Sequence, residues 1–295
     1  MLKALQTGFL LMLALAANAQ AEIKVTDDTG RTLRLARPAQ RIVTLAPHMA
    51  ETLYAAGAGE RLVGTVEFSD YPPEAQKVRR VGGYSRVDLE AVAALKPDLV
   101  IAWQSGNAPA TIDALRALGL TVYVSQPDRI EDVAREIERF GELAGTEKIA
   151  APKAAELRRR QAALQREYAG RPTVRVFYQI WKQPLSTIGG KQIISSVIRL
   201  CGGENVFGAL ETMAPTVSVE AVLAANPEAI VASGMDAARP EWLDDWRRWP
   251  TISAVARDNL FFVPPELIQR HTPRLVDGAE ILCRHLESAR QKHPK

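Results

Sequence analysis

A segment of 16 residues occurs twice in this sequence, and this repeat constrains the fold more than any other feature. Residues 87–102 align without a gap on residues 217–232, at a constant spacing of 130 residues. Each copy begins with an N-cap residue, Asp88 or Ser218, and continues as a short Ala-rich helix that ends ahead of a proline. A continuous apolar stretch follows, which is typical of a strand buried in a parallel sheet. The repeat predicts two copies of one helix–strand unit.

The elements around the two copies also follow one order. Residues 41–45 and residues 174–179 are both apolar strands, and each leads into a helix that ends in a glycine-containing turn. We therefore predict an α/β protein built from two similar parallel-sheet lobes, an N-terminal lobe over residues 41–146 and a C-terminal lobe over residues 171–295.

A long helix is predicted between the lobes. Residues 147–168 are rich in Ala, Leu, Glu, Lys, Arg and Gln, contain no glycine and have one early proline, Pro152. A helix of about 20 residues spans roughly 30 Å, which is enough to cross from one lobe to the other. We assign residues 147–170 to a rigid linker that limits hinge motion. Ahead of the first lobe, residues 22–40 read as a hairpin with a turn at Gly30.

The amino terminus has the pattern of a secretory signal. Lys3 precedes an uncharged run over residues 9–17, and Ala19-Gln20-Ala21 is a small-x-small cleavage pattern. We predict a signal peptide over residues 1–21, with a second acceptable cleavage site two residues earlier. No cysteine lies near either site to carry a lipid, and no other stretch has the roughly 20 apolar residues of a membrane span. The expected location is periplasmic, without a membrane anchor.

The two cysteines and the charge narrow the possible functions. In an oxidising compartment Cys201 and Cys283 are expected to form a disulfide, with two separate buried thiols as the alternative. The formal charge of +3 is small and the charges are mixed along the chain, so nucleic acid is not an expected partner.

Enzyme and metal motifs are missing from the sequence. No two of the four histidines have metal-ligand spacing. Residues 57–59 lack the third glycine of a dinucleotide loop, residues 189–192 lack the Ser or Thr of a phosphate loop, and residues 83–87 do not complete a nucleophile elbow. We predict neither catalysis nor a metal site nor a resident cofactor.

Aromatic side chains mark the expected ligand site. Ligands of parallel α/β lobes bind beyond the carboxyl ends of the strands, and two facing lobes make a cleft. Ordinary core packing is an equally good reading of any one aromatic, whereas the spacing of Trp242, Trp246 and Trp249 favours packing. The candidate cleft residues are Phe68, Tyr71, Tyr84, Trp103, Trp181, Glu266, Leu267, Ile268, Gln269, Arg270 and His271.

Three stretches carry a family resemblance. Residues 69–73 (SDYPP), 94–103 (ALKPDLVIAW) and 201–205 (CGGEN) closely resemble the periplasmic cobalamin-binding proteins of vitamin B12 importers, a branch of the helical-backbone family that binds metal chelates and siderophores. The resemblance implies that a rigid helix joins two α/β lobes and that cobalamin binds between them. It also implies a monomer that docks on the membrane permease of an ATP-driven (ABC) importer. The paired cysteines of the family correspond to Cys201 and Cys283.

Several cleft positions differ from the family pattern. Phe68 stands where a tyrosine is usual, Tyr84 and Leu267 stand where tryptophans are found, Glu266 replaces an aspartate, and Ala214 replaces another cleft tryptophan. Related proteins of this fold bind haem or ferric siderophores, and Tyr84 with His271 is a conceivable pair of haem ligands. The shared motifs nevertheless belong to the cobalamin branch. A sensor or scavenger that takes no part in transport is a further alternative.

The repeat also places Glu90 and Glu220 at equivalent points of the two lobes, two residues after each helix N-cap. A carboxylate in the first turn of a helix complements the helix dipole, which is the simpler explanation for either glutamate alone. In the resembling family, glutamates at these positions meet arginines on the two permease subunits. We therefore expect Glu90 and Glu220 to be docking residues.

Overall fold

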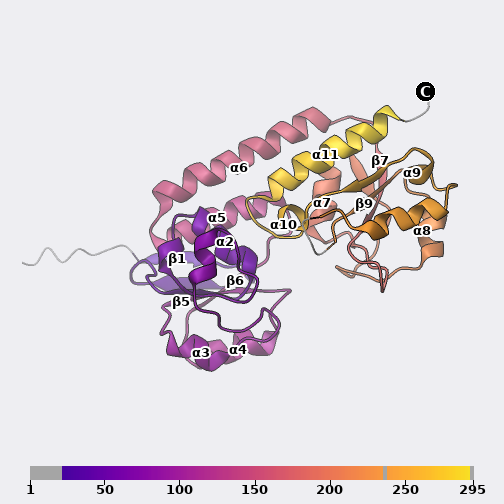
Figure 1. Cartoon of the computed structure of the whole chain (residues 1–295). Helices are drawn as coiled ribbons and strands as arrows, with labels where there is room; N and C mark the ends of the chain where they lie inside the picture. Colours follow the sequence, from indigo (N-terminus) through magenta and orange to yellow (C-terminus); the bar gives the residue numbers. More distant parts are fainter. Residues whose placement is uncertain (1–21, 235–237, 293–295) are drawn as a thin grey trace, which may run out of the picture.

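The structure, a computed structural model, describes residues 22–234 and 238–292. The predicted signal peptide lies outside the described residues. Figure 1 shows two lobes with a long helix, α6, passing along one side of both.

The N-terminal lobe contains a parallel four-stranded sheet in the order β4-β3-β5-β6. Its central strand β5 is buried along most of its length because apolar side chains cover both faces. The strands are β3 (Ile42–Thr44), β4 (Leu62–Gly64), β5 (Leu99–Trp103) and β6 (Val122–Ser125), and the α-helices are α2 (Pro47–Ala55), α3 (Leu89–Ala94), α4 (Pro109–Ala117) and α5 (Ile130–Ala144).

The C-terminal lobe repeats this arrangement with the sheet order β10-β9-β7-β8, again parallel. In each lobe the first strand lies between the second and the third, so the predicted fold class of two similar parallel-sheet lobes is confirmed. The elements are β7 (Val174–Gln179), α7 (Ile193–Leu200), β8 (Gly203–Asn205), α8 (Val219–Ala225), β9 (Ala229–Ala232), the 3-10 helix Glu241–Arg248, α9 (Ser253–Ala256), β10 (Leu260–Phe262), α10 (Pro265–Ile268) and α11 (Leu275–Gln291).

The sequence repeat forms the same local structure twice. The Asp88 carboxylate accepts a hydrogen bond from the backbone N–H of Ala91 at the start of α3, and the Ser218 hydroxyl accepts the equivalent bond from Ala221 at the start of α8. These caps satisfy free backbone donors at each helix start. The apolar half of each copy becomes a central strand, β5 or β9.

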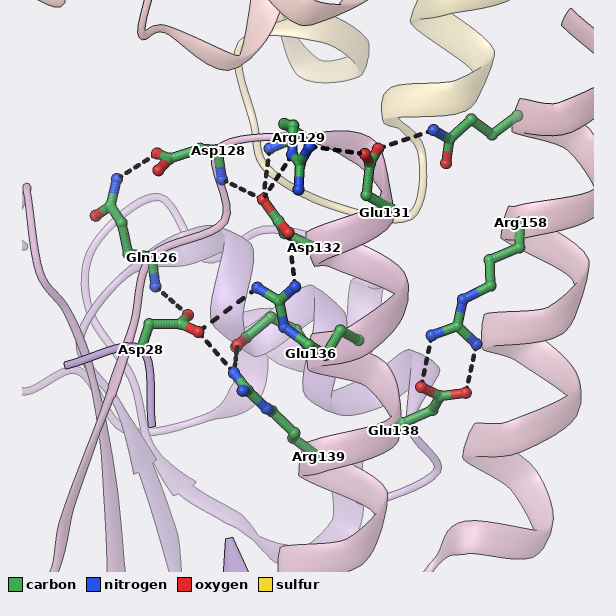
Figure 2. A network of polar contacts seen from close by, with 12 residues as sticks. Asp28, Gln126, Asp128, Arg129, Glu131, Asp132, Glu136, Glu138, Arg139 and Arg158 are labelled. Carbon is green, nitrogen blue, oxygen red and sulfur yellow. Dashed lines mark hydrogen bonds and ion pairs between the residues drawn. The ribbon is translucent and has the colours of Figure 1, made fainter. Parts of the chain in front are cut away.

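The linker helix α6 spans Glu147–Tyr168 and packs against α5, α7 and α11. Arg158 donates to Glu138 of α5 (Nη2 to Oε2, 2.6 Å; Figure 2), while Arg160 of α6 donates to Asp277 of α11 (2.6 Å). The helix is thus tied to both lobes. The hairpin of β1 (Ile23–Thr26) and β2 (Thr32–Leu35) is antiparallel, and Asp28 at its turn donates its backbone N–H to Val124 of β6.

The predicted disulfide is present. Cys201 at the end of α7 and Cys283 within α11 are fully buried and bonded, with their Cα atoms 4.7 Å apart. The packing role predicted for three tryptophans is also confirmed, since Trp246 is buried against Phe177 and both Trp242 and Trp249 pack against the same cluster. Within residues 22–234 and 238–292, no helix combines the length and the apolar character needed to cross a membrane.

Candidate functional site

A hollow of about 600 Å³ lies between the lobes, at the carboxyl ends of strands from both sheets. On the N-terminal side it is lined by residues that follow β5 and β6, and on the C-terminal side mainly by loops that follow β7 and β8. This is the edge at which parallel α/β sheets bind ligands. The lining residues are Gln104, Ser105, Gln126, Asp128, Arg129, Gly190, Lys191, Arg199 and Met213.

Exposed aromatic side chains also lie on connections that follow strands of both sheets. In the described part of the chain, Phe68, Tyr71 and Tyr84 are exposed on the connection from β4 to α3, and Trp181 is exposed after β7. Phe68 is the extreme case, because 70% of its surface is accessible to solvent. Core packing therefore does not explain these four side chains. Large apolar groups that water surrounds are instead typical of a surface that binds a ligand or partner.

Trp103, at the carboxyl end of β5, belongs to an aromatic cluster that joins the two lobes. Its ring lies 5.0 Å from His48 and 6.3 Å from Tyr84, both in the N-terminal lobe, and 5.7 Å from His271 in the C-terminal lobe. The His48 and His271 rings are 5.4 Å apart. The histidine spacing in the sequence argues against a metal site and indicates no other role for His48. Its place just after Pro47, where the chain leaves β3 and enters α2, was the signal that could have identified it.

The two imidazoles are neutral at neutral pH. Burial, with smaller effects from His271 and Arg270, lowers the pKa of His48 well below its usual value. Burial also lowers the pKa of His271 to about 4. Within the described residues, His48 Nε2, His271 Nδ1 and Trp103 Nε1 are buried without a hydrogen-bond partner. Each such buried atom without a partner costs about 1–3 kcal/mol of folding free energy.

One buried amide that the sequence analysis did not select, Asn107, orders this wall of the site. Its Nδ2 donates to the carbonyl oxygens of Leu45 (3.0 Å) and Tyr84 (2.7 Å), while its Oδ1 accepts from the backbone N–H of Trp103 (2.7 Å). Three chain segments are thereby fixed by one side chain. The neighbouring Gly106 is required for space, because a Cβ atom there would lie 1.8 Å from the Trp103 ring.

Residues 266–271, the last of the predicted cleft residues, lie partly at the candidate site and partly in the core. Glu266 and Leu267 lie half-buried in α10, Arg270 reaches the other lobe, and His271 joins the aromatic cluster. Gln269 donates to the carbonyl of Gly234 (3.1 Å). Ile268 is fully buried in the main core, so its prediction as a ligand contact is wrong, because the one-turn helix α10 turns this apolar side chain inward.

The two candidate docking glutamates are both exposed in first helical turns, Glu90 in α3 and Glu220 in α8. A hydrogen bond from its own backbone N–H, and then one from Ser218, lowers the pKa of Glu220. Glu90 borders a second hollow, of about 570 Å³, that Glu67 and Asp88 also line. Figure 1 shows α3 and α8 on different lobes, both away from α6.

In the described part of the molecule, no three or more His, Cys, Asp or Glu side chains lie close enough together to hold a metal ion.

Residues 42–267 match the model of a family described as periplasmic binding protein. The chain is 37% identical over 256 residues to the vitamin B12-binding protein of Vibrio cholerae serotype O1, covering 86% of this chain and 92% of that protein. It is 33% identical over 253 residues to the protein of the same name from Yersinia pestis, covering 86% of this chain and 88% of that protein.

Among solved structures, the periplasmic vitamin B12 binding protein BtuF of Vibrio cholerae superposes with a TM-score of 0.81 at 37% identity. The match covers 87% of this chain and 99% of that chain. The periplasmic heme-binding protein RhuT from Roseiflexus superposes with a TM-score of 0.72 at 21% identity, over 86% of this chain and 100% of that chain. That second likeness shows a shared fold alone.

Proposed function

This chain belongs to the periplasmic binding protein family, and we propose that its ligand is cobalamin or a related corrinoid. The ligand is captured in the cleft between the lobes and delivered to the membrane permease of an ABC importer. In this proposal the protein is a periplasmic monomer, exported with the help of residues 1–21, and it has no catalytic role, no resident cofactor and no membrane anchor.

The observation that carries the proposal is the set of exposed aromatic side chains at strand ends of both lobes, beside a hollow that both lobes line. A corrin ring is large and flat, and its apolar faces suit stacking against aromatic side chains. The identity to two vitamin B12-binding proteins over nearly their whole length supports the same ligand. The proposed contacts are Phe68, Tyr84, Trp103, Trp181, Glu266, Leu267, Gln269, Arg270 and His271, with His48 added.

Haem or a ferric siderophore is the second candidate ligand, and the unpartnered imidazoles of His48 and His271 are the observation that favours it. Tyr84 and His271, the pair considered from the sequence, each pack against Trp103, as His48 also does. The His48 and His271 rings lie in direct contact, so these two imidazoles are the pair to test for iron binding.

Titration of the purified protein with cyanocobalamin and, separately, with haemin tests the proposal. We expect calorimetry to show one cyanocobalamin per chain and no saturable binding of haemin, with absorbance spectra recorded in parallel. Saturable haemin binding without cyanocobalamin binding would replace the proposed ligand. Because most of the proposed contacts are uncharged side chains, the affinity should change little between low and high salt.

Tyr84→Ala and Trp181→Ala test the placement of the ligand. Each change removes an aromatic surface from one wall, so the dissociation constant for cyanocobalamin should rise about tenfold or more. Leu118→Ala is the matched control, because Leu118 is also an exposed apolar side chain but lies at the end of α4, outside the aromatic cluster. Unchanged affinity in both aromatic variants, with the fold intact by circular dichroism, would rule out this cleft.

A further inference from the structure

Two arginines of the C-terminal lobe, Arg270 and Arg274, each bind a carboxylate of the N-terminal lobe. Arg274 donates from Nε and Nη2 to the two oxygens of Glu51 in α2, at 2.7 and 2.8 Å. Arg270 donates to both oxygens of Asp70 on the connection after β4, the second of these bonds measuring 3.0 Å. We call these four residues the interlobe clasp.

The inner pair of the clasp is shielded from water. The Glu51 side chain is only 4% exposed and that of Arg274 is 18% exposed. Burial disfavours the charged guanidinium, but its hydrogen bonds to Glu51 and the negative charges near it, that of Glu51 first, together outweigh this effect and raise the pKa of Arg274. The Arg274 guanidinium also lies 3.8 Å above the centre of the Tyr71 ring, so this one side chain holds both α2 and the segment after β4.

The outer pair holds the same segment. Its hydrogen bonds from Arg270 keep the pKa of the Asp70 carboxyl below its usual range. Asp70 and Tyr71 come directly after Phe68 and Ser69, and Phe68 has a positive φ of 62°, which is uncommon for a residue with a bulky side chain. From its own lobe the segment is held by Arg80, which donates to the Ser69 carbonyl (2.8 Å).

The location of the clasp argues against a role in stability alone. A buried ion pair gives little net stability, because desolvation of the two charges offsets their attraction. Bidentate pairs instead fix orientation closely. Here both pairs cross between lobes beside the His48, Trp103 and His271 cluster. The outer pair ends on the segment that carries the exposed Phe68 and Tyr71, and the Arg274 of the inner pair contacts the same segment through the Tyr71 ring.

We propose that the two pairs of the clasp position the site, with Arg274 as a positioning residue and Arg270 acting through Asp70 in addition to its proposed ligand contact. They hold the aromatic wall of the N-terminal lobe, the segment that carries Phe68 and Tyr71, and keep the two lobes at the binding separation before the ligand arrives. Capture then requires little closure, and the free protein is already competent to bind. The inference rests on the proposed function, because its first readout is the affinity for a corrinoid.

The first test compares Arg274→Gln with the wild type. If only a fraction of the free variant has the correct wall and lobe separation, its apparent affinity for cyanocobalamin falls to that fraction of the wild-type value. We expect the dissociation constant to rise about tenfold at 25 °C, mainly through slower association in stopped-flow fluorescence. The exchanged pair Glu51→Arg with Arg274→Glu should recover part of the affinity. Asp70→Asn, a change at the more exposed pair that leaves the proposed ligand contact Arg270 in place, is the second variant if Arg274→Gln does not fold.

A matched control separates positioning from stability. Arg160→Gln removes pairs of similar geometry between α6 and Asp277 and Glu280 of α11, away from the aromatic wall. It should lower the melting temperature but leave the affinity unchanged. Equal losses of affinity in Arg160→Gln and Arg274→Gln would overturn the proposal, and so would wild-type affinity in both clasp variants.

The separation of the lobes is measured directly with spin labels on Asp113→Cys and Glu211→Cys, whose side chains are 74% and 81% exposed on different lobes. The distance distribution of the ligand-free wild type should be narrow, and that of Arg274→Gln should broaden. A distribution that stays equally narrow in the variant would contradict the clasp. This measurement uses no ligand, so it tests the clasp independently of the proposed function. If the wild type binds no corrinoid, the proposed function fails, but the distance distributions still decide whether the clasp holds the lobes.

Discussion

At the scale of single residues, buried polar side chains decide the shape of the candidate site. Asn107 is buried, and its amide joins the end of β3, the loop at Tyr84 and the end of β5. No short aliphatic side chain could replace these three hydrogen bonds, so the backbone donor and acceptors they satisfy would be left unpaired in its absence.

Asn107→Ala should therefore weaken ligand binding as well as the fold. We expect a loss of about 1–3 kcal/mol in the free energy of unfolding and a rise of about tenfold in the dissociation constant for cyanocobalamin. Asn205→Ala is the matched control, since that buried amide also makes three hydrogen bonds, but within the C-terminal lobe. Chemical denaturation and calorimetry measure the two effects. A similar loss of affinity in both variants would show that Asn107 acts only through stability.

Glu136 in α5 is a second buried polar residue, and it lies under the N-terminal hairpin. It accepts a hydrogen bond from the Tyr123 hydroxyl (3.0 Å), lies 3.6 Å from Arg139, and is close to the polar network around Asp28 in Figure 2. Burial, and then the negative charge of Asp28, raises the pKa of Glu136 to about 8. The folded protein therefore keeps a proton on Glu136 at neutral pH.

This shift predicts how stability depends on pH. The folded pKa of about 8 lies above the usual 4.5, so the contribution of Glu136 is fully present below about pH 4.5 and is lost as pH rises toward 8. Glu136→Gln mimics the protonated form. Its melting temperature relative to the wild type should therefore increase between pH 5 and pH 8, with little difference at pH 4.

Glu138→Gln, two residues further along α5, is the control for this pH dependence. The hydrogen bond from Arg158 lowers the pKa of Glu138, so its contribution is already complete at pH 5 and is lost only in more acidic solution. The effect of Glu138→Gln should be constant from pH 5 to pH 8. If the two variants gave parallel melting curves against pH, the assignment of the raised pKa to Glu136 would be wrong.

At the scale of elements, the disulfide joins the end of α7 covalently to α11. It closes a loop with a sequence separation of 82 residues, and on the chain-entropy model a loop of this size stabilises the fold by about 4 kcal/mol. Unfolding by guanidinium of the oxidised and the reduced, alkylated protein measures this difference. Affinity for the ligand at 25 °C should persist after reduction, because both cysteines are in the core and outside the candidate site.

The same elements show which structure could be predicted from sequence. Local patterns are sufficient for α6, whose composition lacks glycine over 22 residues, and for the paired helix–strand units, whose caps and apolar strands are local features. They are insufficient for Glu51, Asp70 and Arg274, whose partners are 200 or more positions away and meet only when the lobes assemble. The prediction of Ile268 as a ligand contact fails for a related reason. The direction of a side chain in a one-turn helix depends on tertiary packing, which the local sequence does not specify.

At the scale of the whole molecule, the two lobes present equivalent glutamates on separate helices, and this arrangement bears on the transport partner. Glu90 and Glu220 are exposed, occupy the same position in the two copies of the repeat, and have no ion pair in the described residues. Neither residue lines the interlobe hollow. A partner with one arginine for each lobe could pair with both carboxylates, which favours a defined docking orientation.

The double variant Glu90→Arg with Glu220→Arg tests this docking role. Two like-charge contacts would replace two attractive pairs, so binding to the permease and uptake of the ligand should be abolished. The affinity for cyanocobalamin should stay at the wild-type level, because neither side chain belongs to the proposed ligand contacts. Asp113→Arg with Glu204→Arg is the matched control, since it reverses the same number of exposed acidic charges, one on each lobe, at other sites. Uptake at the normal rate by the docking variant would refute the docking role and favour a sensor or scavenger. Equal loss of uptake in both double variants would instead show that total charge, and not these two positions, governs the encounter with the permease.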